Sequence, residues 1–410
     1  MTDSRIGRRD VLLGAAALAP GMAAAQPAEA IAANVLETSA ENQAATFRNM
    51  DRSNPVRTIR RGAQVLPLPP HARQLDGLSY DVAGAAHGVE DYMARNRTSG
   101  LIVLKGGRIA LERYGMGNTP TSRWTSFSTA KSMNSTLVGA ALRDGAIRSL
   151  DDPVEHYLPA LKGSAYEGVS VRNVMRMCSG VAWTETYVTT GDSDIARMSA
   201  ALASRRKGAL MELMRTRPRA APQGTKFNYS TGEACLLGWV VAAATGRSLA
   251  DYYSQKIWSR VGMEADGYWQ LEAPGGLETS GMGVSARLRD YARFGQFMLE
   301  DGVAAGRRVL PVGWRDLAGH PDTIATAQGR LEPGYALGYG YQWWSLPRGA
   351  AAFAAHDGAF TAEGIFGQFI YVHPREQVVA VVWSAWRSAW ESERETETYA
   401  LLGAAIRALS

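Results

Sequence analysis

The chain has 410 residues, of which 46% are hydrophobic and 20% are charged. This balance supports a sizeable hydrophobic core and is not the composition of a disordered protein. The formal net charge of +5 is spread along the chain, and the one basic block that stands out is Arg205-Arg206-Lys207. The charge pattern therefore does not indicate a nucleic-acid groove.

The first 25 residues have the layout of an export signal. Arg8-Arg9 precede a short apolar run, and Ala23-Ala24-Ala25 offers a small-residue cleavage site. This order predicts a twin-arginine signal peptide over residues 1–25, with an irregular alanine-rich arm as the alternative. The apolar run is about half as long as a membrane span requires, so we expect a periplasmic or secreted protein without stable membrane insertion.

Residues 26–75 have weak periodicity and are rich in Ala, Pro and Arg. We expect them to lie as an extended segment over the surface of the main body, which we place at residues 76–410. Within that body, two short β-rich runs at 101–104 and 109–114 are joined by Lys105-Gly106-Gly107-Arg108. This pattern predicts a hairpin.

A second hairpin is predicted near the C-terminus, where β-rich runs at 367–372 and 378–383 flank a turn. A segment with helical periodicity follows at 396–409. The long stretch between the hairpins, from 129 to about 300, is predicted to be mostly helical, with helices at 131–142, 234–244 and 250–261.

This order of elements predicts an α+β fold. The two hairpins are expected to share one antiparallel sheet flanked by helices, and the helical stretch would form a second lobe. The cleft between the two lobes is the expected place for a ligand.

Several common catalytic patterns are absent from the sequence. It contains no Gly-x-Ser-x-Gly, no Gly-x-x-x-x-Gly-Lys-[Ser/Thr] and no His-Glu-x-x-His, and its six histidines form no pair at metal-ligand spacing. Two cysteines, Cys178 and Cys235, are too few for a four-cysteine zinc site and are interpreted as buried thiols, with one disulfide as the alternative. We therefore expect neither a metal nor another cofactor.

Ser128-Thr129-Ala130-Lys131 is the strongest candidate for chemistry. Residues at i and i+3 lie on one face of a helix, so a lysine buried beneath the serine would have a lowered pKa and could accept the hydroxyl proton. The backbone N–H of a serine at a helix N-terminus can also stabilise an oxyanion. A second match, Ser204-Arg205-Arg206-Lys207, lies in a basic, polar run and is interpreted as a solvated face.

Two further segments could complete such a site. Tyr229 follows a turn and precedes a predicted helix, so its phenol could project into the cleft and relay a proton. Gly364 stands at the entry of the first strand of the C-terminal hairpin, where it would let a substrate approach the backbone closely. Taken alone, these segments fit equally well an ordinary half-buried tyrosine and a flexible strand entry.

Taken in chain order, these three segments resemble the serine β-lactamase and penicillin-binding-protein superfamily, in particular its class C-related branch that contains the 6-aminohexanoate-dimer hydrolases. The resemblance covers residues 45–405 and is supported by Asp151-Asp152-Pro153-Val154, by Gly283-Val284-Ser285-Ala286-Arg287 and by Tyr339-Gly340-Tyr341-Gln342-Trp343-Trp344. It implies a β-lactamase/DD-peptidase-like α+β fold and serine hydrolase activity on a small-molecule substrate. A homodimer is compatible with this branch.

The resemblance also implies a role for each matching residue. Ser128 would be the acylated nucleophile, Lys131 the general base and Tyr229 the residue that shuttles the proton. The backbone N–H groups of Ser128 and Ile365 would form the oxyanion hole, and a slip of the strand register would replace Ile365 by Phe366.

Three positions are expected to contact substrate. Gly364 would let the substrate approach the strand, and Tyr187 resembles a tyrosine of a substrate-contacting loop. Asp192, and Asp194 in the same loop, could meet a substrate ammonium group. Solvated loop charge is the alternative interpretation of both aspartates.

Two departures from the family pattern bear on the substrate. Ala362-Glu363-Gly364 replaces a Lys-Thr-Gly motif whose lysine attracts a substrate carboxylate, and Tyr229-Ser230-Thr231 replaces Tyr-x-Asn. Both changes favour a hydrolase of small linear amides or esters, of the 6-aminohexanoate-oligomer kind. A β-lactamase, a DD-peptidase or carboxylesterase, and an inactive binding protein of the same fold are the alternatives.

Overall fold

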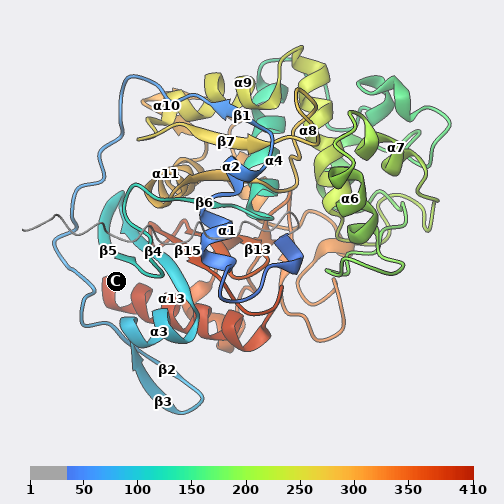
Figure 1. Ribbon diagram of the computed structural model, residues 1–410. Helices are drawn as coiled ribbons and strands as arrows, with labels where there is room; N and C mark the ends of the chain where they lie inside the picture. Colours follow the sequence, from blue (N-terminus) through green and yellow to red (C-terminus); the bar gives the residue numbers. More distant parts are fainter. Residues whose placement is uncertain (1–34) are drawn as a thin grey trace, which may run out of the picture.

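The structure, a computed structural model, describes residues 35–410 and is built around a seven-stranded antiparallel sheet (Figure 1). The strand order is β11-β12-β13-β14-β15-β4-β5. The bounds are β4 (Thr98–Lys105), β5 (Arg108–Tyr114), β11 (Gly338–Tyr339), β12 (Trp344–Ser345), β13 (Phe360–Gly364), β14 (Gln368–His373) and β15 (Val378–Ser384). The two predicted hairpins are β4–β5 and β14–β15, and they share one sheet because β15 pairs with β4.

Helices cover both faces of this sheet. Alternate residues of a strand point to opposite faces. In β4, Ile102 and Leu104 belong to the same core cluster as α11 (Leu288–Leu299), whereas Leu101 and Val103 belong to the cluster of α3 (Val89–Arg95) and α13 (Ser392–Leu409). Figure 1 shows α3 and α13 on the same side of the sheet. Burial on both faces explains the uninterrupted apolar runs at 101–104 of β4 and 378–383 of β15.

A second sheet has the order β1-β7-β8-β6. Its strands are β1 (Val56–Ile59), β6 (Arg123–Thr125), β7 (Gly267–Gln270) and β8 (Val284–Arg287). Because β7 and β8 fall within 129–300, this stretch is less uniformly helical than the sequence predicts. Periodicity misses such strands because each has only four residues and the partners are distant in sequence, as in the pairing of Val56 with Gln270.

The segment before the main body is more deeply integrated than a surface segment. It contains η1 (Val35–Glu37), α1 (Gln43–Arg48) and α2 (Met50–Ser53), followed by β1. Phe47 of α1 is fully buried, so this segment contributes to the core as well as covering it. The predicted signal peptide lies outside the described residues.

The helical part of the chain is centred on α4 (Thr129–Arg143) and α8 (Thr231–Thr245), which pack against each other. The predicted helix at 250–261 consists of α9 (Leu249–Tyr253), a π-helical turn η4 (Ser254–Trp258) and α10 (Ser259–Val261), and the Ser248 side chain caps it. The other helices are α5 (Val171–Met175), α6 (Asp194–Ala203), α7 (Ala209–Arg215), α12 (Trp314–Gly319), η2 (Val154–His156), η3 (Pro159–Leu161), η5 (Ile324–Thr326) and η6 (Ala351–His356).

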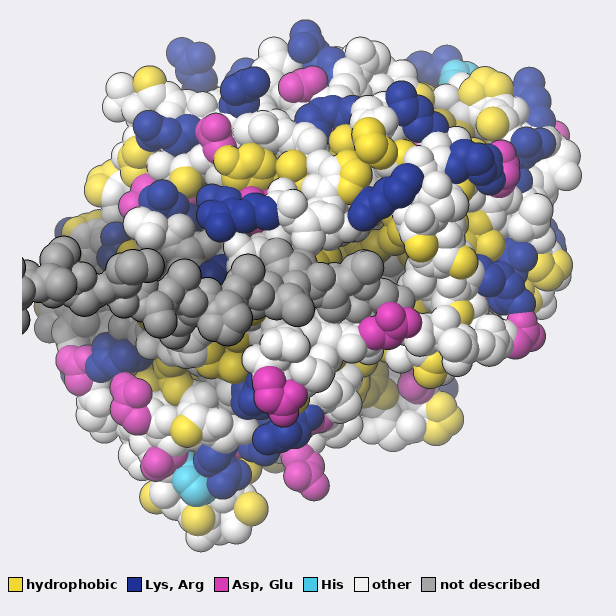
Figure 2. Space-filling view, in the orientation of Figure 1, with side chains coloured by type: hydrophobic (Ala, Val, Ile, Leu, Met, Phe, Trp, Pro, Cys, Tyr) yellow, Lys and Arg dark blue, Asp and Glu magenta, His cyan; other side chains and the backbone are white. Residues whose placement is uncertain are grey.

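Two small hairpins complete the fold: β2 (Ser79–Val82) with β3 (Ala85–Gly88), and β9 (Val303–Ala304) with β10 (Arg307–Arg308). Cys178 and Cys235 are buried free thiols. Figure 2 shows Lys and Arg side chains spread over one face with Asp and Glu among them, rather than gathered in one patch. Within residues 35–410, no helix is both long enough and apolar enough to cross a membrane.

Candidate active site

Ser128 lies where the chain passes from β6 into α4. It is the N-cap residue of α4, and Lys131 follows one turn later. Ser128 is 8% exposed and Lys131 is 1% exposed. The two side chains therefore meet in a largely buried environment, where electrostatic effects are stronger than in bulk water.

The terminal nitrogen of Lys131 is surrounded by three oxygen atoms. Nζ lies 2.9 Å from Ser128 Oγ, 2.9 Å from Thr231 Oγ1 and 3.0 Å from the carbonyl oxygen of Gly281. Thr231 donates its hydroxyl proton to Glu185, so its oxygen accepts from Lys131, and the carbonyl oxygen can only accept. A neutral Lys131 therefore spends both N–H bonds on Thr231 and Gly281, and its lone pair faces the Ser128 hydroxyl.

The surroundings make the neutral form of Lys131 accessible. Burial lowers the pKa of Lys131 to about 8, and the negative charge of Glu185 acts in the opposite direction. Glu185 also accepts hydrogen bonds from the backbone N–H of Thr231, at 2.9 Å, and from the indole of Trp183. Glu185 thus orients Thr231, and through it Lys131. No motif marked Glu185 in the sequence, because its partners lie 46 and 2 residues away.

Tyr229 ends the loop before α8, where the Ser230 side chain caps the helix. Lys131 Nζ lies 4.9 Å from the centroid of the Tyr229 ring, and that ring stacks on Trp344 at 5.5 Å. Burial raises the pKa of Tyr229 and the charge of Glu185 raises it further, whereas the Ser128 hydroxyl lowers it. The phenol therefore stays protonated at neutral pH next to Ser128.

The end of β13 lies against the N-terminus of α4. A Cβ added to Gly364 would be 3.0 Å from the backbone nitrogen of Ser128, so no larger residue fits there without displacement. The N–H groups of Ser128 and Ile365 have no hydrogen-bond acceptor among residues 35–410. Phe366 N–H, by contrast, donates to the carbonyl oxygen of Ala389 at 2.9 Å. Of the two register positions, Ile365 is therefore the one with a free donor.

The residues beside these two N–H groups have backbone conformations that are rare outside glycine. Phe127 precedes Ser128 with φ 45°, and Phe366 follows Ile365 with φ 61°. Such positions cost about 1–3 kcal/mol each. The ring of Phe47 packs against both, at 4.8 Å from Phe127 and 5.2 Å from Phe366. The N-terminal segment thus helps to hold both turns in place.

The loop at 183–198 delivers only one of its predicted residues to the site. Tyr187 lines the cavity described below and donates a hydrogen bond to Glu185 at 3.0 Å. Asp192 does not line that cavity: it pairs with Arg197, and its side chain is 89% exposed. The described geometry therefore gives Asp192 no contact with a ligand near Ser128.

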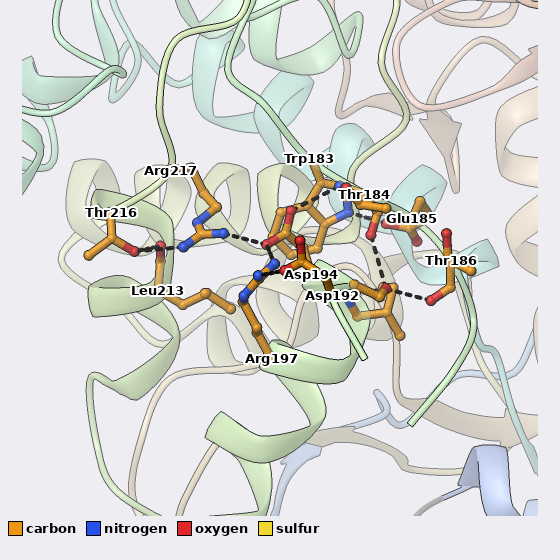
Figure 3. Close-up of polar contacts among 12 residues, drawn as sticks. Trp183, Thr184, Glu185, Thr186, Asp192, Asp194, Arg197, Leu213, Thr216 and Arg217 are labelled. Atoms are coloured by element: carbon orange, nitrogen blue, oxygen red, sulfur yellow. Dashed lines mark hydrogen bonds and ion pairs between the residues drawn. The ribbon is translucent and has the colours of Figure 1, made fainter. Parts of the chain in front are cut away.

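Asp194 is a buried anchor of the same loop (Figure 3). Its carboxylate accepts hydrogen bonds from Thr184 N at 2.9 Å, from Arg197 at 2.9 Å and from Arg217 at 2.6 Å. Figure 3 shows Asp194 between the two arginines, with Glu185 on the neighbouring stretch of the loop. These bonds fix the loop at its base, which places Glu185 and Tyr187.

The candidate groups open onto a cavity of about 960 Å³. Ser128, Tyr229, Gly364 and Ile365 line one part of it, and the cavity continues past the end of β13 to the surface of α13. This volume suits a small molecule or a short linear chain. Within residues 35–410, no group of three or more His, Cys, Asp or Glu side chains is arranged to hold a metal ion.

The chain is similar in sequence to known hydrolases. A protein-family model described as Beta-lactamase matches residues 85–405. The 6-aminohexanoate-dimer hydrolase of Paenarthrobacter ureafaciens is 29% identical over 345 residues, which cover 83% of this chain and 84% of that protein. A Beta-lactamase of Pseudomonas fluorescens is 24% identical and covers 50% of this chain and 61% of its own length.

Solved structures show the same fold. A Bacillus anthracis structure provisionally described as a 6-aminohexanoate-dimer hydrolase has a TM-score of 0.78 at 23% identity, covering 90% of this chain and 94% of its own. A family VIII carboxylesterase has a TM-score of 0.60 at 16% identity, covering 78% and 96%. The α+β fold predicted from the sequence, with its antiparallel sheet and flanking helices, is therefore confirmed.

Proposed function

The chain belongs to the Beta-lactamase family of serine hydrolases, and we propose that it cleaves small linear amides or esters through an acyl-enzyme formed at Ser128. The observation that carries this proposal is the hydrogen-bond arrangement around Lys131. When Lys131 is neutral, Thr231 and Gly281 accept its two N–H bonds, and its lone pair is left for the Ser128 hydroxyl. In its neutral form, a lysine so placed can accept the serine proton.

Acylation follows from these positions. Ser128 Oγ attacks the substrate carbonyl carbon while its proton passes to Lys131 Nζ, and the carbonyl oxygen gains a negative charge. The N–H groups of Ser128 and Ile365, which have no acceptor among residues 35–410, are the donors for that oxyanion. Tyr229 transfers a proton to the leaving amine or alcohol and regains one from Lys131, and the carbon–leaving group bond breaks.

Deacylation repeats the same steps with water as the nucleophile. Lys131, neutral again once the proton has passed to the leaving group through Tyr229, accepts a proton from the water that attacks the ester carbonyl. The tetrahedral intermediate collapses, Ser128 Oγ takes up the proton, and the free acid leaves. No step uses Asp192, which is ion-paired at the surface.

The preference for linear substrates is supported by the relatives and by the strand motif. The relative from Paenarthrobacter ureafaciens is named for cleaving the 6-aminohexanoate dimer. In this chain the strand beside the nucleophile presents Ala362-Glu363-Gly364, so no lysine is available there to attract a carboxylate. Trp344, stacked on Tyr229, supplies a flat apolar wall for an alkyl chain.

Active-site labelling tests the proposal directly. The intact mass of the protein is measured after exposure to a serine-reactive phosphonate, with Ser128→Ala as the control. We expect one adduct that maps to Ser128 and is absent from the control. A well-folded protein without an adduct, or an adduct that persists in Ser128→Ala, would remove Ser128 as the nucleophile. Turnover of matched amides, esters and a chromogenic cephalosporin then ranks the substrate classes.

Substitution of Tyr229 by Phe tests the leaving-group step. Removing the phenolic proton should reduce kcat for an amide by about 10²–10⁴-fold, the range of general acid catalysis, and should affect an activated ester much less. The reason is that an amine must be protonated to leave, whereas a nitrophenolate leaves unaided. The measurement compares kcat of the same acyl group as amide and as nitrophenyl ester. Equal losses on both would contradict the assigned role.

Three further features belong to the proposal. We infer export by the signal peptide at 1–25, a mature chain that starts near Gln26 and consists of the segment 26–75 and the body 76–410, and a homodimer, with which the resemblance is compatible. Fractionation of a producing cell, N-terminal sequencing of the mature protein and light scattering test them in turn.

A further inference from the structure

The cavity beside Ser128 has a second, acidic end. It runs past the C-terminal end of β13 to α13. Four lining residues of α13 follow one another at intervals of four: Glu395, Tyr399, Gly403 and Arg407. That spacing places them on one face of the helix. Glu363 of β13 lines the cavity opposite this face and receives a hydrogen bond from the hydroxyl of Tyr399.

The two carboxyl groups at this end are buried without a cationic partner among residues 35–410. Glu363 is 4% exposed and Glu395 is 9% exposed, and neither forms an ion pair with any Lys, Arg or His of residues 35–410. Glu395 accepts from Tyr335 at 3.4 Å. The second oxygen of Glu363, Oε2, has no hydrogen-bond partner among the described residues. A buried carboxyl oxygen without a partner is costly, so the site is suited to a ligand that donates.

The pKa values of the two carboxyl groups agree with the lack of a cation, because a positive charge beside them would lower both. Burial raises the pKa of Glu395 to about 7, and burial together with the charge of Glu395 raises the pKa of Glu363 further. Arg407 also lines the cavity, but it follows Glu395 by 12 residues, which is about 18 Å along a helix. It is therefore too far along α13 to neutralise the pair.

An aromatic wall connects the acidic end with the nucleophile. Trp344 stacks on Tyr229 with ring centroids 5.5 Å apart and meets Tyr335 edge-on at 5.6 Å. Tyr229 is next to Ser128, and Tyr335 contacts Glu395. An alkyl chain lying on Trp344 would therefore have one end near the reacting carbonyl and the other near the two carboxyl groups.

We propose that Glu363 and Glu395 form a subsite for the ammonium group of a linear substrate, held at a fixed remove from the bond that Ser128 cleaves. The inference rests on the proposed hydrolase function, since it assigns the class of substrate that this function acts on. An alkylammonium group supplies three N–H donors and a positive charge, which satisfies Glu363 Oε2 and compensates the pair. A substrate carboxylate in the same place would be repelled.

Ligand binding to the Ser128→Ala variant tests the subsite without turnover. Hexylammonium, hexanol and hexanoate share one chain and differ only in the end group, and calorimetry at about pH 8 measures their affinities while the amine is still protonated. We expect hexylammonium to bind at least about tenfold more tightly than hexanol, as for a charge-assisted hydrogen bond, and hexanoate to bind most weakly.

Two isosteric substitutions identify the residues responsible. Glu363→Gln and Glu395→Gln, each made in the Ser128→Ala variant, should bring hexylammonium down to the affinity of hexanol. Glu393→Gln is the matched control, because Glu393 is an exposed glutamate on the same helix, and it should leave all three affinities unchanged. Circular dichroism and Tm check that each variant is folded.

The outcomes separate this inference from the proposed function. Equal affinity for hexylammonium and hexanol, or full binding in folded Glu363→Gln and Glu395→Gln proteins, would overturn the subsite whether or not the enzyme hydrolyses amides. Selective ammonium binding in Ser128→Ala, together with no phosphonate adduct on the unsubstituted protein, would leave the subsite in place. The same result would reject the hydrolase mechanism.

Discussion

The two ends of the cavity treat buried charge in opposite ways. At the nucleophile end, Lys131 is fully buried, yet three oxygen atoms surround its nitrogen and Glu185 stands one hydroxyl away. At the acidic end, Glu363 and Glu395 are buried with no cation beside them among residues 35–410, and Glu363 Oε2 is unpartnered. The first arrangement is complete before any substrate arrives, as preorganised catalysis requires. The second is completed only by a ligand.

The largest loss of activity should come from substitutions at the nucleophile end of the cavity. Ser128→Ala and Lys131→Ala should each reduce kcat/KM by at least about 10³-fold, because nucleophile and base act as one unit. For the same reason, the double variant should be little worse than either single one. Steady-state kinetics on one ester substrate measures all three. Additive losses would show that the two residues act independently.

The pH dependence of kcat/KM should reflect Lys131. The pKa of Lys131 lies near 8, lowered by burial, and only the neutral form can accept the serine proton. Activity should therefore fall about tenfold per pH unit below pH 8 and level off above it. A pH–rate profile on a neutral ester, which does not depend on the charge of the acidic end, measures this limb. A flat profile between pH 6 and 8 would contradict the role.

Glu185 is the carboxylate that completes the nucleophile end, so its substitution tests whether that end depends on a buried charge. Glu185→Gln leaves the Thr231 hydroxyl without its anionic acceptor and removes a charge that raises the pKa of Lys131. We expect kcat to fall by about 10–100-fold, as for a lost charge-assisted hydrogen bond, and the acid limb to move to lower pH.

Thr231→Val is the matched variant for this prediction, because it removes the hydroxyl between Glu185 and Lys131. If the three residues act in series, Glu185→Gln combined with Thr231→Val should cost no more than the worse single variant. A limb that stays in place in Glu185→Gln, with kcat unchanged, would mean that Glu185 serves only to hold the loop.

The smallest expected effect concerns stability at the acidic end. The pKa of Glu395 is raised to about 7 in the folded protein from the ordinary carboxyl range, so the folded state retains a proton that the unfolded state has lost. Stability should accordingly decline as pH rises from about 4.5 to 7. Glu395→Gln removes this contribution and should raise Tm at pH 8 by about 2 °C, with little change at pH 4. Thermal scans at both pH values decide it, and an equal change at both would assign the effect to packing.

Elements that depend on local sequence patterns could be predicted from the sequence alone. The two hairpins and the C-terminal helix follow from alternation, turn residues and helical periodicity, and the structure contains all three. The short strands β7 and β8 were missed because they depend on partners such as β1, roughly 200 residues away. Phe47 was missed as a core residue for the same reason, since Phe127 and Phe366 are its neighbours only in space.

The sequence by itself determined the local chemistry of this protein: a serine and a lysine one helical turn apart, a tyrosine at the start of a helix and a glycine at the end of a strand. These follow from residue identity and short spacing, which act before the chain folds. Only the tertiary structure decided which charges share the cavity. It placed Glu185 one hydroxyl away from Lys131, left Asp192 exposed at the surface and brought Glu363 and Glu395 into the same cavity. Electrostatic partnership depends on distance and burial, and neither is a property of spacing along the chain.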